Sequence, residues 1–421
     1  MNRIVTSTIL AAAMIVGAQT TNAQQVLTYE AYMKNVREKN IEYIVEKYNV
    51  DIAEARTQAA KTTNDPELSV AYSNNQDWSL MMGQGVEAEL SYTFEMGKRK
   101  ARIEVARSEA QLQSAILEDY FRNLRADATL LYLNTLIQKQ KYDLISRSCE
   151  QMKQLARADS LRFALGEIPQ TDAMQSLLEA RILENEKQQM ESEYRNALIE
   201  LFAFQGERTF VPVDSLQGKL HLTDKAYNLQ QLTQWALQNR TDLQVVLASK
   251  KVSEKNLKLA KANRMIDLGI SIGGSYNMRV RNEEAPAPPF KGITAGITIP
   301  LPFSAINKGE IRAAQYEIKQ WNAVYDEVEL QICKEVTQAY NNYLSATSQL
   351  EKYQEFILPD AEVILHNKNY SYLRGEENLL ELLNAQRTYN EVQQNYCQTL
   401  EDYFTALIEL ERAAGVWDIE L

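Results

Sequence analysis

The string GISIG at residues 269–273 matches a catalytic pattern in both residue types and spacing. In G-x-S-x-G motifs the serine is a nucleophile on a sharp strand-to-helix turn, and a triad histidine activates it. Here apolar and small residues alternate straight through Ser271, which predicts an extended strand. The two histidines, His221 and His366, lie in no supporting motif. We therefore do not expect the chain to be an enzyme.

The cysteines form no recognisable disulfide or metal pattern. Cys149, Cys333 and Cys397 are odd in number and lie inside helical patterns, so we expect core or groove thiols. With two histidines and dispersed cysteines, the sequence predicts no tight transition-metal site and no cofactor.

The composition predicts a chain of long helices. Only 9 prolines and 15 glycines interrupt the 421 residues. The formal net charge is −11, which argues against a nucleic-acid partner because the phosphate backbone is also negative.

The first 23 residues have the pattern of a secretory signal peptide. Arg3 gives a positive start, residues 4–17 are apolar, and Ala23 ends a cleavage-like segment. A buried core helix is the alternative, but the order of these features favours export. After residue 23 we find no apolar run near the ~18 residues that a membrane helix needs.

One short strand with two different faces is predicted before a long helical run. Val86, Leu90 and Phe94 fall on an apolar face, and Glu87 and Glu89 fall on the opposite face. Three more stretches alternate in the same way, at residues 68–73, 268–276 and 293–299.

These four strands predict two β-hairpins, residues 67–94 and 267–301. The strands are close to the ~9–11 residues that a tilted strand needs to cross a bilayer. A small soluble sheet packed on a helix is the alternative, but the helices have apolar stripes of their own to bury. Four strands cannot close a membrane barrel, and open edges in lipid leave backbone groups unpaired. Several chains must therefore share one barrel, which implies an oligomer.

The chain contains a tandem duplication with an offset of 209 residues (375 minus 166). Two strings and one glycine recur at this offset: GE at 166 and 375, ALIEL at 197 and 406, and glycine at 206 and 415. A pair of glycines at one spacing, with an identical string between them, indicates two related halves.

The duplication divides the chain into a first repeat (24–206), a linker (207–224), a second repeat (225–415) and a tail (416–421). Each repeat is expected to contain a helix, a β-hairpin and a coiled-coil hairpin of long helices. The coiled-coil hairpins would cover residues 98–205 and 308–414. The first long helix would run from Lys98 to about Ala158.

Four strings carry a family resemblance: GKRKARIEVA, IPLPFSAINKGEIRAAQ, GEENLLELLNAQRTYNEVQ and LERAAG. With the duplicated layout, the chain after the signal peptide resembles the TolC-type outer-membrane efflux proteins. The first two strings are most similar to the heavy-metal (CusC/CzcC-like) branch. The resemblance implies a mainly α fold with a small β part. Four strands from each of three chains would form a twelve-stranded barrel, continued by a long α-helical tunnel.

The resemblance also implies a function. The chain would be a homotrimeric channel in the outer membrane of a Gram-negative bacterium, with a long periplasmic extension. It would passively conduct substrate, such as heavy-metal cations, from a periplasmic adaptor (membrane fusion) protein and an inner-membrane pump of the RND type. The barrel residues expected to face lipid are Val86, Leu90, Phe94, Ile270 and Ile297.

The turns between the long helices would form the periplasmic tip. By resemblance, the adaptor contacts are expected at Leu165, Gly166, Glu167, Arg374, Gly375 and Glu376. Ordinary glycine turns between helices would explain the two glycines equally well, and the two interpretations are compatible.

A gate and an acidic ring are expected near this tip. Tyr372 and Asp172 fall at positions where relatives close the tunnel, although Asp172 would also suit helix capping beside Thr171. Glu381 matches the position of an acidic pore ring, which would attract cations. A capping box with Asn378 is the alternative interpretation of Glu381.

Two other functions remain open at this point. One is an outer-membrane duct for drugs or for proteins secreted by a type I system. The other is a periplasmic coiled-coil scaffold or adaptor, which four membrane-length amphipathic strands disfavour.

Overall fold

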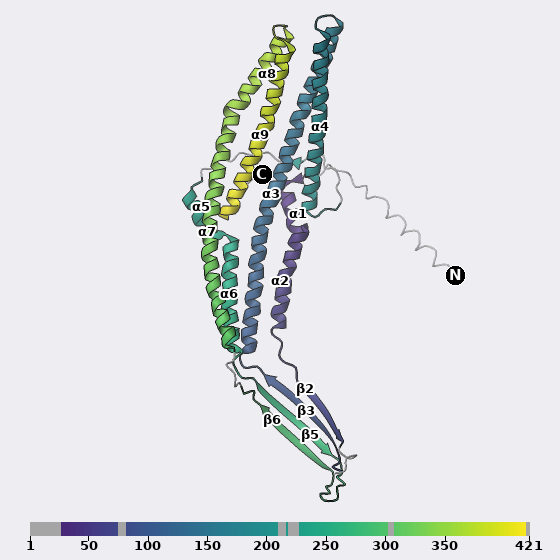
Figure 1. Cartoon of the computed structure of the whole chain (residues 1–421), viewed down its shortest axis with the longest axis vertical. Helices are drawn as coiled ribbons and strands as arrows, with labels where there is room; N and C mark the ends of the chain where they lie inside the picture. The colour runs from purple at the N-terminus through teal and green to yellow at the C-terminus, as the bar shows by residue number, and fades with distance from the viewer. Residues whose placement is uncertain (1–26, 75–80, 209–215, 218–226, 302–306, 418–421) are drawn as a thin grey trace, which may run out of the picture.

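The computed structural model describes residues 27–74, 81–208, 216–217, 227–301 and 307–417. The molecule is elongated, with a small sheet at one end and two helical hairpins at the other (Figure 1). The predicted signal peptide lies outside the described residues, as does most of the predicted linker. No helix within the described ranges is both long enough and apolar enough to cross a membrane.

The first half begins with helices α1 (Tyr29–Lys39) and α2 (Ile41–Ala59). After the first hairpin of strands come α3 (Lys98–Ala164) and α4 (Gln170–Phe204). Helix α3 has 67 residues and is therefore roughly 100 Å long. It continues six residues beyond the predicted end at Ala158, because the segment up to Ala164 contains no helix breaker.

The second half repeats this order. Its elements are α5 (Leu229–Asn239), α6 (Thr241–Ala262), α7 (Lys308–Lys352), α8 (Leu358–Leu373) and α9 (Leu379–Ala414). A π-helical turn, Tyr353–Ile357, joins α7 to α8 just before Pro359. Proline supplies no backbone N–H, which disturbs the regular helical hydrogen bonds of the preceding turn.

The same kind of contact occurs at the end of each half. A side chain in the turn between the first two helices of the half donates a hydrogen bond to a carbonyl at the end of its last helix. Asn40 donates a side-chain hydrogen bond to the carbonyl of Phe204, at 2.8 Å. Arg240, in the equivalent turn between α5 and α6, donates to the carbonyl of Ala413, at 3.4 Å. Phe204 and Ala413 are 209 residues apart, so the structural repeat follows the sequence repeat.

The main sheet contains β2 (Glu67–Asn74), β3 (Gln84–Phe94), β5 (Leu268–Asn277) and β6 (Phe290–Thr298). They are antiparallel in the order β2-β3-β5-β6, so the two predicted hairpins lie side by side. Near the middle of the molecule, a separate two-stranded parallel sheet pairs β1 (Leu27–Thr28) with β4 (Leu216–Gln217).

The strand register gathers the apolar residues on one face of the main sheet. Leu90 lies opposite Leu68 on one side and Ile272 on the other, and Ile270 lies opposite Ile297. These side chains are exposed in the single chain. Successive residues of a strand point to opposite faces, so the predicted alternation becomes one continuous apolar surface.

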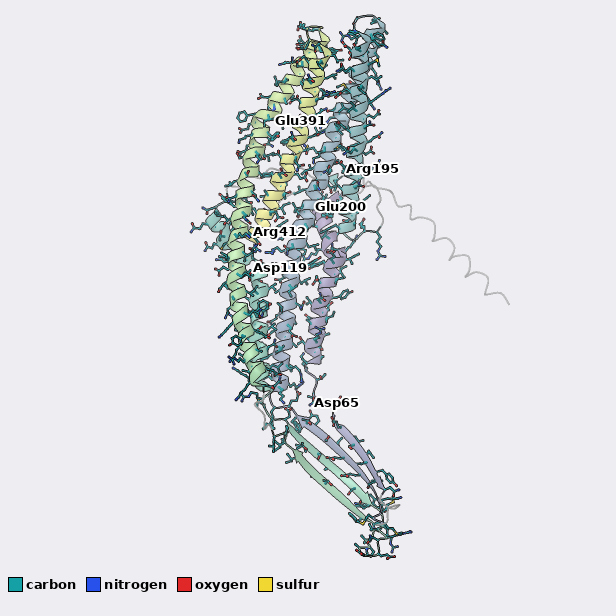
Figure 2. The ribbon with its side chains drawn as sticks, in the orientation of Figure 1. Asp65, Asp119, Arg195, Glu200, Glu391 and Arg412 are labelled. Atoms are coloured by element: carbon teal, nitrogen blue, oxygen red, sulfur yellow. The ribbon has the colours of Figure 1, made fainter. Side chains whose placement is uncertain are left out.

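The opposite face is polar and made of small residues. Glu89 lies between Ser69 and Gly273, and Glu87 between Ala71 and Ser275. Figure 2 shows Asp65 where the helical part of the chain meets this sheet.

The helical part has three clusters of buried apolar residues. One joins α3, α5, α7 and α9, and another joins α1, α3 and α4. The third lies toward the tips of the hairpins and includes Ile145, Met152, Leu183, Tyr372 and Leu383. This third cluster holds the two helical hairpins together near their turns.

Candidate functional site

The two helix-to-helix turns at the end far from the sheet have the same backbone geometry. Gly166 and Gly375 have φ values of +82° and +74°, which other residues adopt at a cost. In each turn the residue after the glycine donates its backbone N–H to the carbonyl five positions earlier, at 2.9 Å and 3.0 Å. This is the Schellman arrangement that ends many helices. The sequence match at offset 209 therefore reflects one turn used twice.

Both turns are open to solvent. A Cβ atom added at Gly166 or Gly375 would meet no atom of the described residues within 4 Å, so the backbone conformation alone requires glycine at these positions. Leu165 is 75% exposed at the end of the first turn. Side chains of both signs surround the second turn, where Arg374 and Glu376 approach to 4.0 Å. The surface at the tips thus combines an apolar side chain with charged groups.

A buried hydrogen bond joins the two hairpins close to these turns. Tyr372 on α8 donates its hydroxyl to Oδ1 of Asp159 on α3, at 2.7 Å. Tyr372 is 4% exposed, and burial together with the Asp159 carboxylate raises the pKa of its hydroxyl. The Arg162 guanidinium lies over the Tyr372 ring at 5.2 Å and within 3.7 Å of Asp159.

The acidic partner of Tyr372 is not one of the gate residues expected from the sequence, which are Tyr372 itself and Asp172. Asp172 is not bonded to Tyr372 in the chain. It lies in the first turn of α4, where the Thr171 hydroxyl is 3.3 Å from its carboxylate. Pro169 is the N-cap residue of α4 and makes no side-chain cap, so Asp172 is not a capping residue either. Asp159 was missed because its contact with α8 depends on how the two hairpins are rotated against each other.

Glu381 takes part in capping α9, as one interpretation of the sequence suggests, and the acidic ring stays a prediction. The Asn378 side chain caps α9 by accepting a hydrogen bond from the Glu381 backbone N–H, at 3.0 Å. The Glu381 carboxylate points to Lys368 on α8, at 3.3 Å. Lys368 also binds Glu377 at 2.8 Å, and the hydrogen bond to Glu377 raises the pKa of Lys368. One lysine therefore partly neutralises two carboxylates, which reduces the field of any acidic ring.

A second polar link between the hairpins was not foreseen. Arg387 on α9 binds Glu179 on α4 with two hydrogen bonds, at 2.9 and 2.6 Å. Glu179 is only 8% exposed at its side chain, whereas Arg387 is 56% exposed. One feature of the sequence could have indicated this ion pair. Glu179 lies among small residues on the buried face of α4, between Ser176 and Ala180, where a carboxylate needs a partner.

A network of charges lies near the middle of the molecule, around Asp119 and Arg412 (Figure 2). Arg240 binds Asp242 at 2.5 Å and Glu335 at 2.6 Å, and its side chain is almost completely buried. Arg122 bridges Asp119 and Asp242 from α3. Burial alone would raise the pKa of Asp242, but the hydrogen bonds and charge of Arg240 lower it on balance.

The described residues contain no group of three or more His, Cys, Asp or Glu side chains that would hold a metal ion. All three cysteines are free. Burial raises the pKa of the Cys397 thiol to about 11, so this thiol stays protonated and unreactive at neutral pH.

Comparison with known proteins identifies the family. Residues 232–416 match the family model described as "Outer membrane efflux protein". Over 396 residues the chain is 23% identical to the cobalt-zinc-cadmium resistance protein CzcC of Cupriavidus metallidurans, covering 92% of this chain and 90% of that protein. The second half of this chain therefore matches the outer membrane efflux protein family. The chain is an outer-membrane channel protein whose long helices form the periplasmic part.

Solved structures have the same fold as this efflux protein. CusC superposes with a TM-score of 0.72 at 17% identity, covering 92% of each chain. The Campylobacter jejuni outer membrane channel CmeC superposes with a TM-score of 0.72 at 13% identity, covering 92% of this chain and 85% of that one. The open-state Neisseria gonorrhoeae channel MtrE gives a TM-score of 0.68 at 16% identity, covering 91% of this chain and 88% of the other. The prediction of a TolC-like fold is thus confirmed.

Proposed function

We propose that three copies of this efflux protein form one passive channel that carries divalent metal cations out of the cell. The observation that carries the proposal is the four-stranded sheet, with one apolar face, one polar face and two edges. Among the described residues, β2 and β6 each pair with one strand only. Unpaired strand edges are very costly in lipid, so the edges must meet those of other copies. Three copies supply a twelve-stranded barrel.

An exposed apolar stripe on α2 supports assembly with a neighbouring copy. Ile41, Val45, Tyr48 and Ile52 are each about half exposed and follow the spacing of one helix face. A stripe of this kind on a long helix is usually covered by another helix. In the channel this cover would come from the next subunit. The residues expected to face lipid, Val86, Leu90, Phe94, Ile270 and Ile297, lie on the apolar face of the sheet.

The polar face of the sheet supports a cation as the transported substrate. Glu87 and Glu89 lie among glycines and serines on the face that would line the pore. Carboxylates around a water-filled pore attract cations and disfavour anions. The relative CzcC is named for resistance to cobalt, zinc and cadmium. A conduit of this type passes the ions without a tight binding site and without catalysis.

The tips are proposed to dock on a periplasmic adaptor protein connected to an inner-membrane pump of the RND type. The contacts would be made by Leu165, Gly166 and Glu167 in the first turn and by Arg374, Gly375 and Glu376 in the second. The open surroundings of both glycines support this, since another helix could approach each turn closely.

The closed state of the tip is proposed to depend on the Tyr372–Asp159 hydrogen bond and the Arg387–Glu179 ion pair. Both join different hairpins of one chain, and both involve a buried carboxylate. Docking of an adaptor would open the tip by separating the hairpins.

Conductance in a planar bilayer tests the proposal. Detergent-extracted protein, shown to be trimeric, is reconstituted in a salt gradient and its conductance and reversal potential are recorded. We expect a small conductance with a reversal potential that indicates cation preference. Protein that washes off membranes with carbonate and remains monomeric would contradict the channel and favour a periplasmic scaffold. A conducting trimer without cation preference would contradict the metal-cation substrate only.

A further inference from the structure

The helix ends nearest the sheet are basic, although the whole chain is acidic. The ends of α2, α3, α6 and α7, with the segments that join them to strands, cover residues 53–66, 95–104, 256–267 and 299–314. These ranges contain eleven lysines and arginines and six aspartates and glutamates, in a chain whose formal net charge is −11. The positive charges are therefore concentrated where the helical part meets the sheet, near Asp65 in Figure 2.

The acidic residues on the polar side of this junction are already paired. Lys98 binds Asp267 at 2.6 Å, and Arg102 binds both carboxylate oxygens of Glu95, at 3.2 and 3.0 Å. By strand alternation, Glu95 and Asp267 continue the polar face of the sheet. Lys98 and Arg102 are four residues apart and therefore share that side of α3.

Three other cations of this junction, Lys100, Lys261 and Arg264, take no part in these two ion pairs. Lys100 is two residues after Lys98, which places it roughly 200° further round α3 and toward the apolar side. Glu104 lies one turn beyond Lys100 and binds Lys255 at 2.9 Å on the neighbouring helix α6. Lys258 also approaches Glu104, at 4.0 Å, and Lys261 follows it by three residues on the same face of α6.

Arg264, two residues after the end of α6, completes the group. Lys100, Lys261 and Arg264 are all exposed, and within the described ranges none of them has an ion pair. Arg264 is followed directly by the exposed apolar side chains of Met265 and Ile266. Phe94 and Met96, which are also exposed, precede the start of α3.

Free cations beside exposed apolar residues, at the end of a membrane-facing surface, match the chemistry of a lipid headgroup boundary. The apolar side chains suit the acyl region, and the cations suit phosphate. We propose that Lys100, Lys261 and Arg264, here called the basic collar, bind the phosphates of anionic phospholipids in the leaflet that faces the long helices. The proposal rests on the proposed position of the sheet in the membrane. Binding there would fix the depth of the channel and link the start of the tunnel to the bilayer.

The test compares two triple variants of the full-length trimer. One is Lys100→Gln, Lys261→Gln and Arg264→Gln. The matched control is Arg157→Gln, Lys334→Gln and Lys352→Gln, which removes three exposed cations from helix positions distant from the sheet. Trimers are incubated with mixed micelles containing phosphatidylglycerol or phosphatidylcholine, and the lipid retained on each trimer is counted by native mass spectrometry.

We expect wild type and control to retain phosphatidylglycerol in preference to phosphatidylcholine. A cation near a membrane surface contributes about fivefold to binding, so the collar variant should lose at least about tenfold of this preference. An excess of inorganic phosphate should displace little of the lipid. Equal retention by the collar variant and the control would overturn the proposal, and so would full displacement by inorganic phosphate, which would indicate a site for free anions.

Measurements on the wild type keep the test decisive if the collar variant does not assemble. Preference for phosphatidylglycerol should then fall as salt is raised from about 50 to about 500 mM, because surface charges are screened. A wild-type trimer that conducts ions but shows no anionic-lipid preference at low salt would overturn the collar and leave the channel intact. Failure to form any trimer or conductance would instead count against the proposed function.

Discussion

Tyr372 on α8 and Asp159 on α3 are 213 residues apart in the sequence, yet their side chains form a buried hydrogen bond of 2.7 Å. Tyr372 also packs in the apolar cluster near the tips. The second carboxylate oxygen of Asp159 is buried and has no hydrogen-bond partner among the described residues. Asp159 therefore depends on Tyr372 and on the nearby Arg162 for its polar interactions, which makes this pair sensitive to movement of the hairpins.

Replacing Tyr372 with Phe should loosen the closed tip. The ring would still fill its place, but Asp159 would lose its hydrogen bond, at a cost of about 1–3 kcal/mol. We expect a higher conductance of the resting channel in planar bilayers. Tyr370→Phe is the control, because Tyr370 is on the same helix but exposed. Equal conductance of wild type and Tyr372→Phe would show that this bond does not hold the tip closed.

Replacing Arg387 with Gln should weaken the contact between α9 and α4. The variant leaves the Glu179 carboxylate buried without its cation. Because Arg387 is more than half exposed, we expect a loss of only about 1–2 kcal/mol. Hydrogen exchange of the tip segments should become faster in the variant.

The control for this variant is Arg195→Gln, which removes an exposed ion pair with Glu191 within one helix. Such pairs contribute about 0.3–0.5 kcal/mol, so tip exchange should hardly change. If both variants gave the same exchange rates as wild type, the Arg387–Glu179 pair would have no role in joining the hairpins.

Asp242 should make the stability of the middle of the molecule depend on pH. Its pKa is held below its ordinary value in the folded chain, since the hydrogen bonds and charge of Arg240 outweigh the effect of burial. A lowered pKa stabilises the fold at pH values above that of the unfolded group, and this contribution is lost as pH falls through the folded pKa. The thermal midpoint of Asp242→Asn should therefore lie below that of wild type at neutral pH, and the difference should shrink below about pH 4.

The exposed Asp51, which has no ion pair among the described residues, provides the comparison for Asp242. Asp51→Asn should have a midpoint close to that of wild type at every pH. A constant difference between wild type and Asp242→Asn across this pH range would contradict the assigned role of Asp242.

Replacing Leu90 with Arg should impair insertion of the sheet into the membrane. Leu90 lies at the centre of the apolar face, between Leu68 and Ile272. An arginine on the lipid face of a barrel costs about 2–4 kcal/mol near the middle of the bilayer. We expect fewer trimers in the outer-membrane fraction. Ser91→Arg, one residue further and on the polar face, should assemble nearly normally, and equal yields of the two variants would contradict the assignment of the faces.

The parts of the fold that local patterns determine could be predicted from the sequence. Alternation of apolar and polar residues is a property of each strand, so it assigns Leu90 and Ile270 to the apolar face without any information on strand pairing. Gly166 and Gly375 were found through the repeat, and their positive φ values explain why glycine occurs at both positions.

Contacts between distant helices could not be predicted in the same way. Whether Tyr372 meets Asp159 or Asp172 depends on the rotation and axial shift of α8 against α3 and α4, and each shift of one turn brings a different residue forward. The pairing of Lys368 with Glu377 and Glu381 also crosses from α8 to the turn and α9. Such pairs require the three-dimensional arrangement of the hairpins.

Replacing Lys368 with Gln should increase the cation preference of the channel. In the wild type, Lys368 partly neutralises Glu377 and Glu381 near the tip, so the variant frees two carboxylates in each subunit. A more negative entrance attracts cations more strongly. The reversal potential in a salt gradient should therefore shift toward the value for ideal cation selectivity. Glu381→Gln should shift it in the opposite direction, because it removes one carboxylate from the same cluster. If neither variant changed the reversal potential, these side chains would not face the conducting path.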